Sequence, residues 1–123
     1  MELKILRKCY QSLLNSLILV AADYEDQVSS LPSFVVVADE VSTTYGEAFY
    51  LVNQLEEAGF INKHAEKLLK DLDNWFDYSP EGEVLDTLKS LKENPYWEKA
   101  RNIAQEILKE LKIQHPYLPE KQI

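Results

Sequence analysis

The chain has 123 residues, of which 21 are acidic and 13 basic, so its formal net charge is −8 at pH 7. Apolar residues make up 46% of the sequence, which is too many for a disordered protein, and the small numbers of Gly (3) and Pro (5) exclude collagen-like and low-complexity chains. The lone Cys9 excludes a disulfide scaffold within the chain. These properties predict one globular domain that is large enough to bury a core.

The first predicted element is a helix over residues 2–24, because apolar residues recur there at alternating spacings of three and four. Basic residues ahead of an apolar stretch also resemble a signal peptide, but Asn15 and Ser16 interrupt that stretch. The longest uncharged run, residues 9–22, is too short to cross a membrane. We therefore expect a buried first helix, a cytoplasmic protein and no membrane partner.

Residues 25–33 are predicted to form a loop, because Pro32 disfavours helical geometry in the residue before it. The following β-branched run could form a strand, but no second β-rich run exists to pair with it. Spacings of three and four from Phe34 to Leu55 instead predict a helix over residues 34–58, with Ser33 as its N-cap and Gly59 just beyond its end.

Within that predicted helix, Thr43, Thr44 and Gly46 have low helix propensity, so a break or kink is expected there. Three later helices are predicted from their capping signals. Asn62 caps the first, and the pairs Ser79–Pro80 and Asn94–Pro95 open the other two, because Pro is favoured at the first helical position.

Together these elements predict an all-α fold, a single-domain bundle of about five amphipathic helices over residues 1–112. The last of these helices covers residues 95–112. The C-terminal tail, residues 113–123, contains Pro116 and Pro119 and is expected to be extended or frayed.

The negative charge is concentrated in residues 9–62, which contain eight acidic residues and no Lys or Arg. In the predicted helix 34–58, the acidic residues lie opposite the apolar stripe, and Tyr50 lies among them. No basic residue lies one helical turn away to neutralise them. Two interpretations stay open: a solvated face that maintains solubility, or a docking surface for a basic protein with Tyr50 as its anchor.

A second cluster of acidic and aromatic residues covers positions 71–78. Asp77 is unfavourably placed there, because negative charge at a helix C-terminus opposes the helix dipole. Such local inconsistency can mark a binding site. The structural alternative places Trp75 and Phe76 in the core and makes Asp77 a cap for the turn that follows.

Patterns for catalysis and cofactor binding are absent from the sequence. Cys9 lies beside the first apolar stripe, and neither His64 nor His115 belongs to a metal-binding pattern. There is no glycine-rich phosphate loop, nucleophile elbow or dinucleotide fingerprint. The basic cluster within residues 4–8 is too small to hold nucleic acid. We therefore expect a protein that is not an enzyme and that has no cofactor, no metal and no nucleic-acid partner.

A small, acidic, all-helical chain with a segment free of Lys and Arg, and with acid-rich clusters at residues 39–57 and 71–78, resembles bacterial immunity proteins. The resemblance is one of class, without a family motif, and it implies binding and blocking of a cognate toxin, often a basic nuclease. Two alternatives remain. One is a structural or self-associating protein, in which the stripe of the first helix forms a homodimer seam; the other is a bundle that encloses a ligand pocket. The candidate partner-binding residues are Asp39, Glu40, Glu47, Tyr50, Glu57, Asp73, Asp77 and Tyr78.

Overall fold

The computed structural model describes residues 2–78 and 80–111, and within them it contains helices and turns but no strand. The predicted all-α, single-domain fold is therefore confirmed. The predicted cap Ser79 and the predicted tail 113–123 lie outside the described residues. The helices are α1 (Leu3–Ala21), α2 (Tyr24–Ser29), α3 (Val37–Phe49), α4 (Val52–Glu57), α5 (Lys63–Asp77), α6 (Leu88–Glu93) and α7 (Pro95–Glu110).

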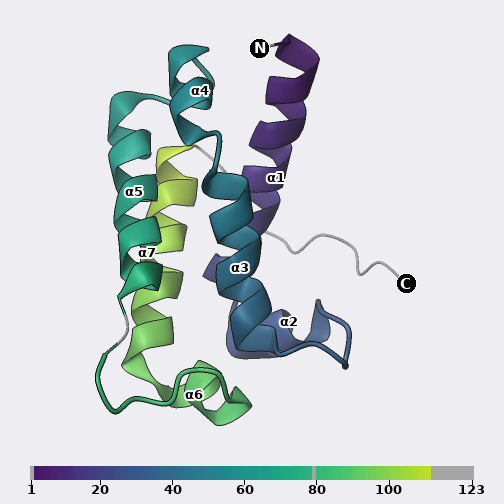
Figure 1. Cartoon of the computed structure of the whole chain (residues 1–123), viewed down its shortest axis with the longest axis vertical. Helices are drawn as coiled ribbons and strands as arrows, with labels where there is room; N and C mark the ends of the chain where they lie inside the picture. The colour runs from purple at the N-terminus through teal and green to yellow at the C-terminus, as the bar shows by residue number, and fades with distance from the viewer. Residues whose placement is uncertain (1, 79, 112–123) are drawn as a thin grey trace.

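Four long helices form the body of the molecule. Helices α1, α3, α5 and α7 run side by side along its long axis, while α2 and α6 lie at one end and α4 lies at the other (Figure 1). Helix α1 packs on α3 and α7, and α5 packs on the same two helices, so each long helix has two long neighbours. In the described part of the chain, none of the helices combines the length and apolarity that a membrane span requires.

The core lies between these four helices and is built from the predicted apolar stripes. Leu13 and Leu17 of α1, Leu69 of α5 and Ile107 of α7 are fully buried. Tyr45 of α3 is also fully buried, and its hydroxyl donates a hydrogen bond of 2.6 Å to the backbone carbonyl of Leu69. A polar atom in the core therefore has a partner, which avoids the cost of an unsatisfied buried group.

The predicted first helix is shorter than expected, and the predicted loop after it is partly helical. Helix α1 ends at Ala21 because Ala22 adopts an extended conformation. The carboxylate of Asp23 then accepts a hydrogen bond of 3.0 Å from the backbone N–H of Asp26 and caps α2. Asp26 and Glu25 lie in the first turn of α2, where negative charge is favourable.

The end of α1 is held by side chains from elsewhere in the chain. Gln27 of α2 donates hydrogen bonds to the carbonyls of Leu19 and Val20, at 3.1 and 3.2 Å. The guanidinium of Arg101 in α7 donates to the carbonyl of Ala22 at 3.2 Å and to Gln27 Oε1 at 2.8 Å. It also donates to the carbonyl of Leu91 in α6 at 2.6 Å, so one side chain connects four helices or their ends.

The predicted helix over residues 34–58 begins later than its apolar spacing suggests. The N–H of Val35 donates to the carbonyl of Pro32 at 3.3 Å, which closes a turn with Ser33 and Phe34 at its tip. Ser33 therefore does not cap the helix, and Phe34 is 87% exposed instead of buried in the core. Helix α3 starts after Val36, which makes no side-chain capping bond.

The same predicted helix is broken at Tyr50–Leu51 and not at the low-propensity residues Thr43–Gly46. Leu51 leaves helical geometry with φ −107° and ψ 20°, and α4 begins at the next residue. The apolar stripe nevertheless continues across the break, because Val52 and Leu55 are buried. Gly59 follows α4 with φ 85°, as its predicted place beyond the helix end requires.

The prediction that a helix opens at Ser79–Pro80 is wrong from Pro80 onward, where the structure describes the chain. The N–H of Glu83 donates to the carbonyl of Pro80 at 3.3 Å, and Gly82 has φ 79°, so this segment forms a turn that excludes a helix. Helix α6 begins only at Leu88, after its N-cap Thr87. The other two predicted caps, Asn62 and Asn94, are confirmed, since each accepts a hydrogen bond from a backbone N–H in the first turn of its helix.

Candidate binding surface

The outer face of α3 carries half of the predicted partner-binding residues. Val41 and Tyr45 turn inward and are fully buried, which orients the opposite side of the helix toward solvent. Asp39 and Glu47 are exposed on that side, and Glu40 is half-buried. Tyr50, the last residue of this face, is 84% exposed. The structure therefore presents these side chains at the surface, as the helical phase predicts.

A shallow depression lies on this face, lined by Thr43, Gly46, Glu47 and Tyr50. A Cβ atom at Gly46 would contact nothing within 4 Å, so the floor of the depression is bare helix backbone and is open to solvent. The four residues follow the spacing i, i+3, i+4 and i+7, which is one face of a helix. Thr43 shares the face of Asp39 by helical phase, whereas helix propensity alone marks Gly46 only as a weak helix former.

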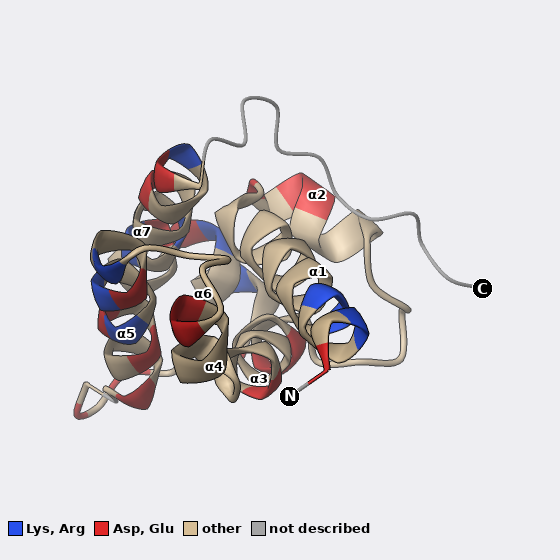
Figure 2. Ribbon diagram, turned by 90° about the horizontal axis from the view of Figure 1, so that it is seen from above, with Lys and Arg blue, Asp and Glu red and all other residues tan. Residues whose placement is uncertain are grey.

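Within the part of the chain that the structure describes, no ion pair neutralises the acidic residues of this face. Figure 2 shows Lys and Arg at the start of α1 and along α5 and α7, whereas the charged residues of α2 and α3 are all Asp or Glu. Among the described residues, the acidic partners in ion pairs are Glu56, Glu66, Asp71 and Glu110, none of which belongs to α3. An incoming basic group would therefore displace water and not an internal cation.

Glu57 is exposed but lies apart from this depression. It is the last residue of α4, beyond the break at Tyr50–Leu51. In one continuous helix over residues 34–58, Glu57 would lie on the same face as Asp39, but the structure interrupts that helix at Leu51. We therefore define the α3 face as Asp39, Thr43, Gly46, Glu47 and Tyr50, without Glu57.

The second predicted cluster lies at the end of α5 and is tied into the fold. The indole N–H of Trp75 donates to the carbonyl of Tyr96 at 3.0 Å, and the hydroxyl of Tyr96 donates to the carbonyl of Trp75 at 3.3 Å. The two rings stack at 5.1 Å, and the ammonium of Lys99 lies 4.3 Å from the centre of the Trp75 ring. These contacts join α5 to α7, which favours the structural interpretation of the aromatic residues.

The acidic residues of this cluster have different surroundings. Asp73 is half-buried, and burial, together with the nearby charge of Asp77, raises the pKa of the Asp73 carboxyl. Asp77 is the exposed last residue of α5 and does not cap the next helix, a role that Thr87 takes. Tyr78 is 53% exposed but packs on Trp75 at 5.5 Å between ring centres. None of these residues lines the depression on α3.

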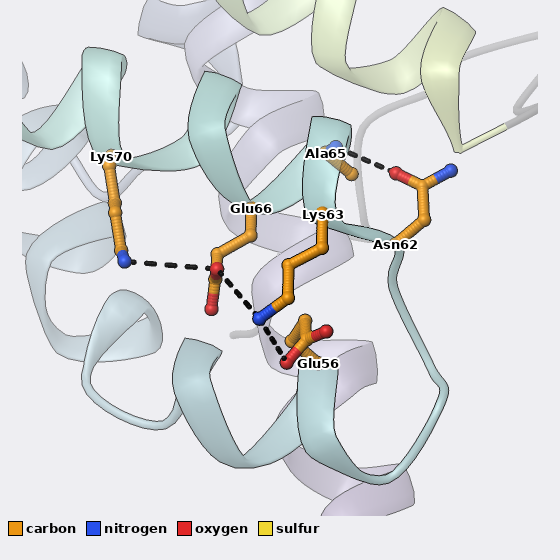
Figure 3. A network of polar contacts seen from close by, with 6 residues as sticks. All are labelled: Glu56, Asn62, Lys63, Ala65, Glu66 and Lys70. Carbon is orange, nitrogen blue, oxygen red and sulfur yellow. Dashed lines mark hydrogen bonds and ion pairs between the residues drawn. The ribbon is translucent and has the colours of Figure 1, made fainter.

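A network of paired charges joins α4 to α5 at the other end of the bundle (Figure 3). The ammonium of Lys63 lies 3.1 Å from a carboxylate oxygen of Glu56 and 3.9 Å from one of Glu66, and that of Lys70 lies 3.8 Å from Glu66. The hydrogen bond to Glu56 raises the pKa of the Lys63 ammonium. Because each carboxylate here has its own cation, this network is complete without an external partner.

An open depression beside this network is lined by Tyr10, Phe60, Asn62 and Glu110, among others. Its polar groups also bind one another, since Asn62 Nδ2 donates to Glu110 Oε1 at 3.2 Å and His64 Nε2 lies 3.8 Å from Glu110 Oε2. Within the described ranges, no group of three or more His, Cys, Asp or Glu side chains is arranged to hold a metal ion. The unpaired α3 face is thus distinct from the other charged surfaces described.

Comparison with protein-family models, with curated proteins and with solved structures gives no match for this chain. The class resemblance to immunity proteins therefore stays a prediction, and any function has to be argued from the geometry of the surface. The α3 face is an exposed, acidic helix face with one large aromatic side chain, Tyr50, at its end.

Proposed function

We propose that this protein is a small binding module of the immunity or inhibitor type, whose α3 face docks on a basic surface of another protein such as a toxin. The observation that carries the proposal is a shallow depression lined by exposed Glu47 and by Tyr50, which is 84% exposed, with exposed Asp39 on the same helix. Tyrosine is a frequent anchor of protein interfaces, because it buries a large ring and keeps a hydrogen-bonding hydroxyl.

Electrostatics supports the same proposal. With no Lys or Arg between residues 9 and 62, the charged side chains of α2 and α3 are all carboxylates and contribute a negative field. Such a field attracts a basic protein and accelerates its association, and salt weakens the effect over a Debye length of about 8 Å at physiological ionic strength. A surface kept acidic only for solubility would not require the open depression or the exposed tyrosine.

The first test combines a charge change with a control of equal net charge. The partner would be captured from extract of the source cells and purified, and its association rate with the full chain would be measured by stopped flow at several salt concentrations. We expect Asp39→Asn with Glu47→Gln to slow association and flatten its salt dependence. The matched pair Glu93→Gln with Glu106→Gln removes the same charge from other exposed positions and should have a smaller effect. Equal effects of the two pairs would reject a local docking face.

Tyr50→Ala should act on dissociation, because loss of a buried anchor shortens the lifetime of a complex. We expect the dissociation rate to rise at least tenfold, a change that a loss of about 1.4 kcal/mol produces. Tyr78→Ala is the matched control, since Tyr78 is also exposed but lies just after α5, outside the α3 face. Unchanged dissociation of the Tyr50→Ala variant would contradict the proposal.

Gly46→Ala separates binding from folding. An added methyl group at Gly46 meets no atom within 4 Å, so it fits the fold and fills the floor of the depression. In a helix interior Ala is more favourable than Gly by about 1 kcal/mol, so the variant should be more stable in urea denaturation. If the α3 face is the docking site, the more stable variant should bind its partner more weakly.

A further inference from the structure

A second surface lies at the end of the molecule where the connection between α2 and α3 meets α6. A groove of about 420 Å³ opens there, lined mainly by apolar side chains that include Val28, Pro32, Val36 and Leu88. Val36 and Leu88 are each 50% exposed, although both are large and apolar. Phe34, at the tip of the turn beside this groove, is 87% exposed.

Local structure explains why these side chains stay uncovered. The turn closed by Pro32 and Val35 holds Phe34 away from the core, and α3 begins only after Val36. Leu88 is the first residue of α6, a short helix that packs against α3. Single exposed apolar residues are ordinary, but several around one groove are typical of an interaction site.

The charge around the groove indicates the kind of partner. Asp86 is the charged residue that lines it, and Glu25, Asp26 and Asp39 are exposed on the adjoining helices α2 and α3. The lysines of α6 face elsewhere: Lys89 lines a different depression, and the ammonium of Lys92 lies over the Tyr24 ring at 5.7 Å from its centre. An apolar groove with acidic borders complements a ligand with an apolar ridge and basic flanks.

We propose that this groove receives an amphipathic helix of the partner protein, with apolar side chains seated against Val36 and Leu88 and with Lys or Arg beside Asp86 and Asp39. The inference rests on the proposed docking of a basic partner and adds the structural element that the partner contributes. A second copy of this chain is a poor occupant, because two molecules of net charge −8 would bring like charges together.

The test uses a synthetic peptide as the probe. A peptide with Leu at positions i, i+3, i+4 and i+7 and Lys elsewhere would be titrated into the ¹⁵N-labelled full chain, and backbone amide shifts would be followed by NMR. We expect shifts concentrated at residues 28–37 and 86–88. A peptide with Glu in place of Lys and one with the Leu residues scrambled around the helix should both bind at least tenfold more weakly. Shifts centred elsewhere, or equal binding of the scrambled or Glu peptide, would overturn the proposal.

Variants of the groove make the result specific. Val36→Ser and Leu88→Ser should each lower peptide affinity at least fivefold, while Ile5→Ser, a change of another exposed apolar residue at the far end of α1, should not. Val36 and Leu88 are each 50% exposed and outside the buried core, so these variants should remain folded. Unchanged affinity of both groove variants would refute the site. If light scattering shows a dimer that these variants break, the groove binds a second copy of this chain and not a helix of a partner protein, and the proposal is overturned.

Failure of this inference and failure of the proposed function give different results. If Tyr50→Ala leaves partner binding unchanged while Leu88→Ser weakens it, the α3 face is wrong and the groove stands. If the reverse holds, the partner docks on the α3 face without using the groove.

Discussion

Tyr45 and Tyr50 are five positions apart, yet their surroundings are opposite. Tyr45 is fully buried and donates its hydroxyl hydrogen to the carbonyl of Leu69, and burial, followed by the charge of Asp73, raises the pKa of that hydroxyl. The phenol therefore stays a donor at neutral pH. Tyr50 is 84% exposed at the end of α3. The first side chain stabilises the contact between α3 and α5, whereas the second is available to a partner.

Asp73 gives a prediction on pH dependence. Burial and the charge of Asp77 raise its pKa in the folded protein above the ordinary value of 3.8, so the folded state holds this proton more tightly than the unfolded state does. Stability should therefore fall as pH rises from about 3.8 through the raised pKa. Asp73→Asn removes this loss and should make the protein more stable at pH 7, but not at pH 3.

Urea denaturation at a series of pH values would measure this difference. Asp71→Asn is the matched control on the same helix, because Asp71 is exposed and already pairs with Lys67 at 3.5 Å. It should give no gain in stability at neutral pH. A loss of stability in Asp73→Asn at pH 7 would show that the carboxylate is favourably placed, against the direction argued from its burial.

At the scale of elements, the end of α1 depends on a side chain from α7. Arg101 donates to the carbonyls of Ala22 and Leu91 and to Gln27, which in turn binds two carbonyls of α1. Burial lowers the pKa of Arg101, and the nearby carboxylates act in the opposite direction, but a guanidinium remains charged in proteins. Without the guanidinium of Arg101, the carbonyls of Ala22 and Leu91 and the side-chain oxygen of Gln27 would lose this hydrogen-bond donor together.

We therefore expect Arg101→Met to lower the free energy of unfolding by about 1.5–3 kcal/mol, the range for hydrogen bonds to a charged group. Lys109→Met, at an exposed position of the same helix, should change it by about 0.5 kcal/mol or less. Chemical denaturation of both variants would measure the difference. Full stability in Arg101→Lys would contradict the interpretation, because an ammonium does not reproduce the forked geometry of a guanidinium.

The predicted elements succeed where a repeating pattern and its caps agree. The apolar stripe of α1 and the caps Asn62 and Asn94 could be predicted from the sequence, because each depends on residues close together in the chain. The break at Tyr50–Leu51 could not be predicted from the apolar spacing, since Val52 and Leu55 continue the buried stripe after it. An apolar spacing that continues unchanged across a break in the helix does not show where the break lies.

The remaining errors come from turns that compete with helices. The apolar spacing assigned Phe34 to the core, but the turn that begins at Pro32 holds it outside any helix. The turn that contains Gly82 likewise overrides the start signal at Ser79–Pro80. For the candidate site, the acids and Tyr50 were predictable from helical phase, whereas the apolar groove was not, because it depends on how α6 meets the connection between α2 and α3.

At the scale of the whole molecule, the uneven charge predicts a response to salt. Eight carboxylates in residues 9–62 have no Lys or Arg within that segment, while the ion pairs described lie mainly on α5. Screening acts over about 10 Å at 0.1 M salt and should relieve more repulsion than it removes attraction. We expect NaCl to raise the melting temperature, and to raise it less in the Asp39→Asn, Glu47→Gln variant.

Differential scanning calorimetry between about 0.02 and 0.5 M NaCl, a range over which the screening length shortens severalfold, would show this trend. The control is the pair Glu93→Gln with Glu106→Gln, at exposed positions of α6 and α7, which should keep more of the salt response. A melting temperature that falls with salt would mean that the network of Lys63, Lys70 and their carboxylates outweighs the repulsion elsewhere.

The packing of α1 against α7 joins the first and last helices described, and this has a consequence for the chain while it is being made. A ribosome adds about 5–20 residues per second, so α1, with its core residues Leu13, Leu17 and Val20, waits on the order of seconds before α7 emerges to pack against it. The uncompensated acidic segment leaves the ribosome during that interval. We expect its charge to hold neighbouring nascent chains apart, so that the same carboxylates protect the unfinished protein from aggregation before they face any partner.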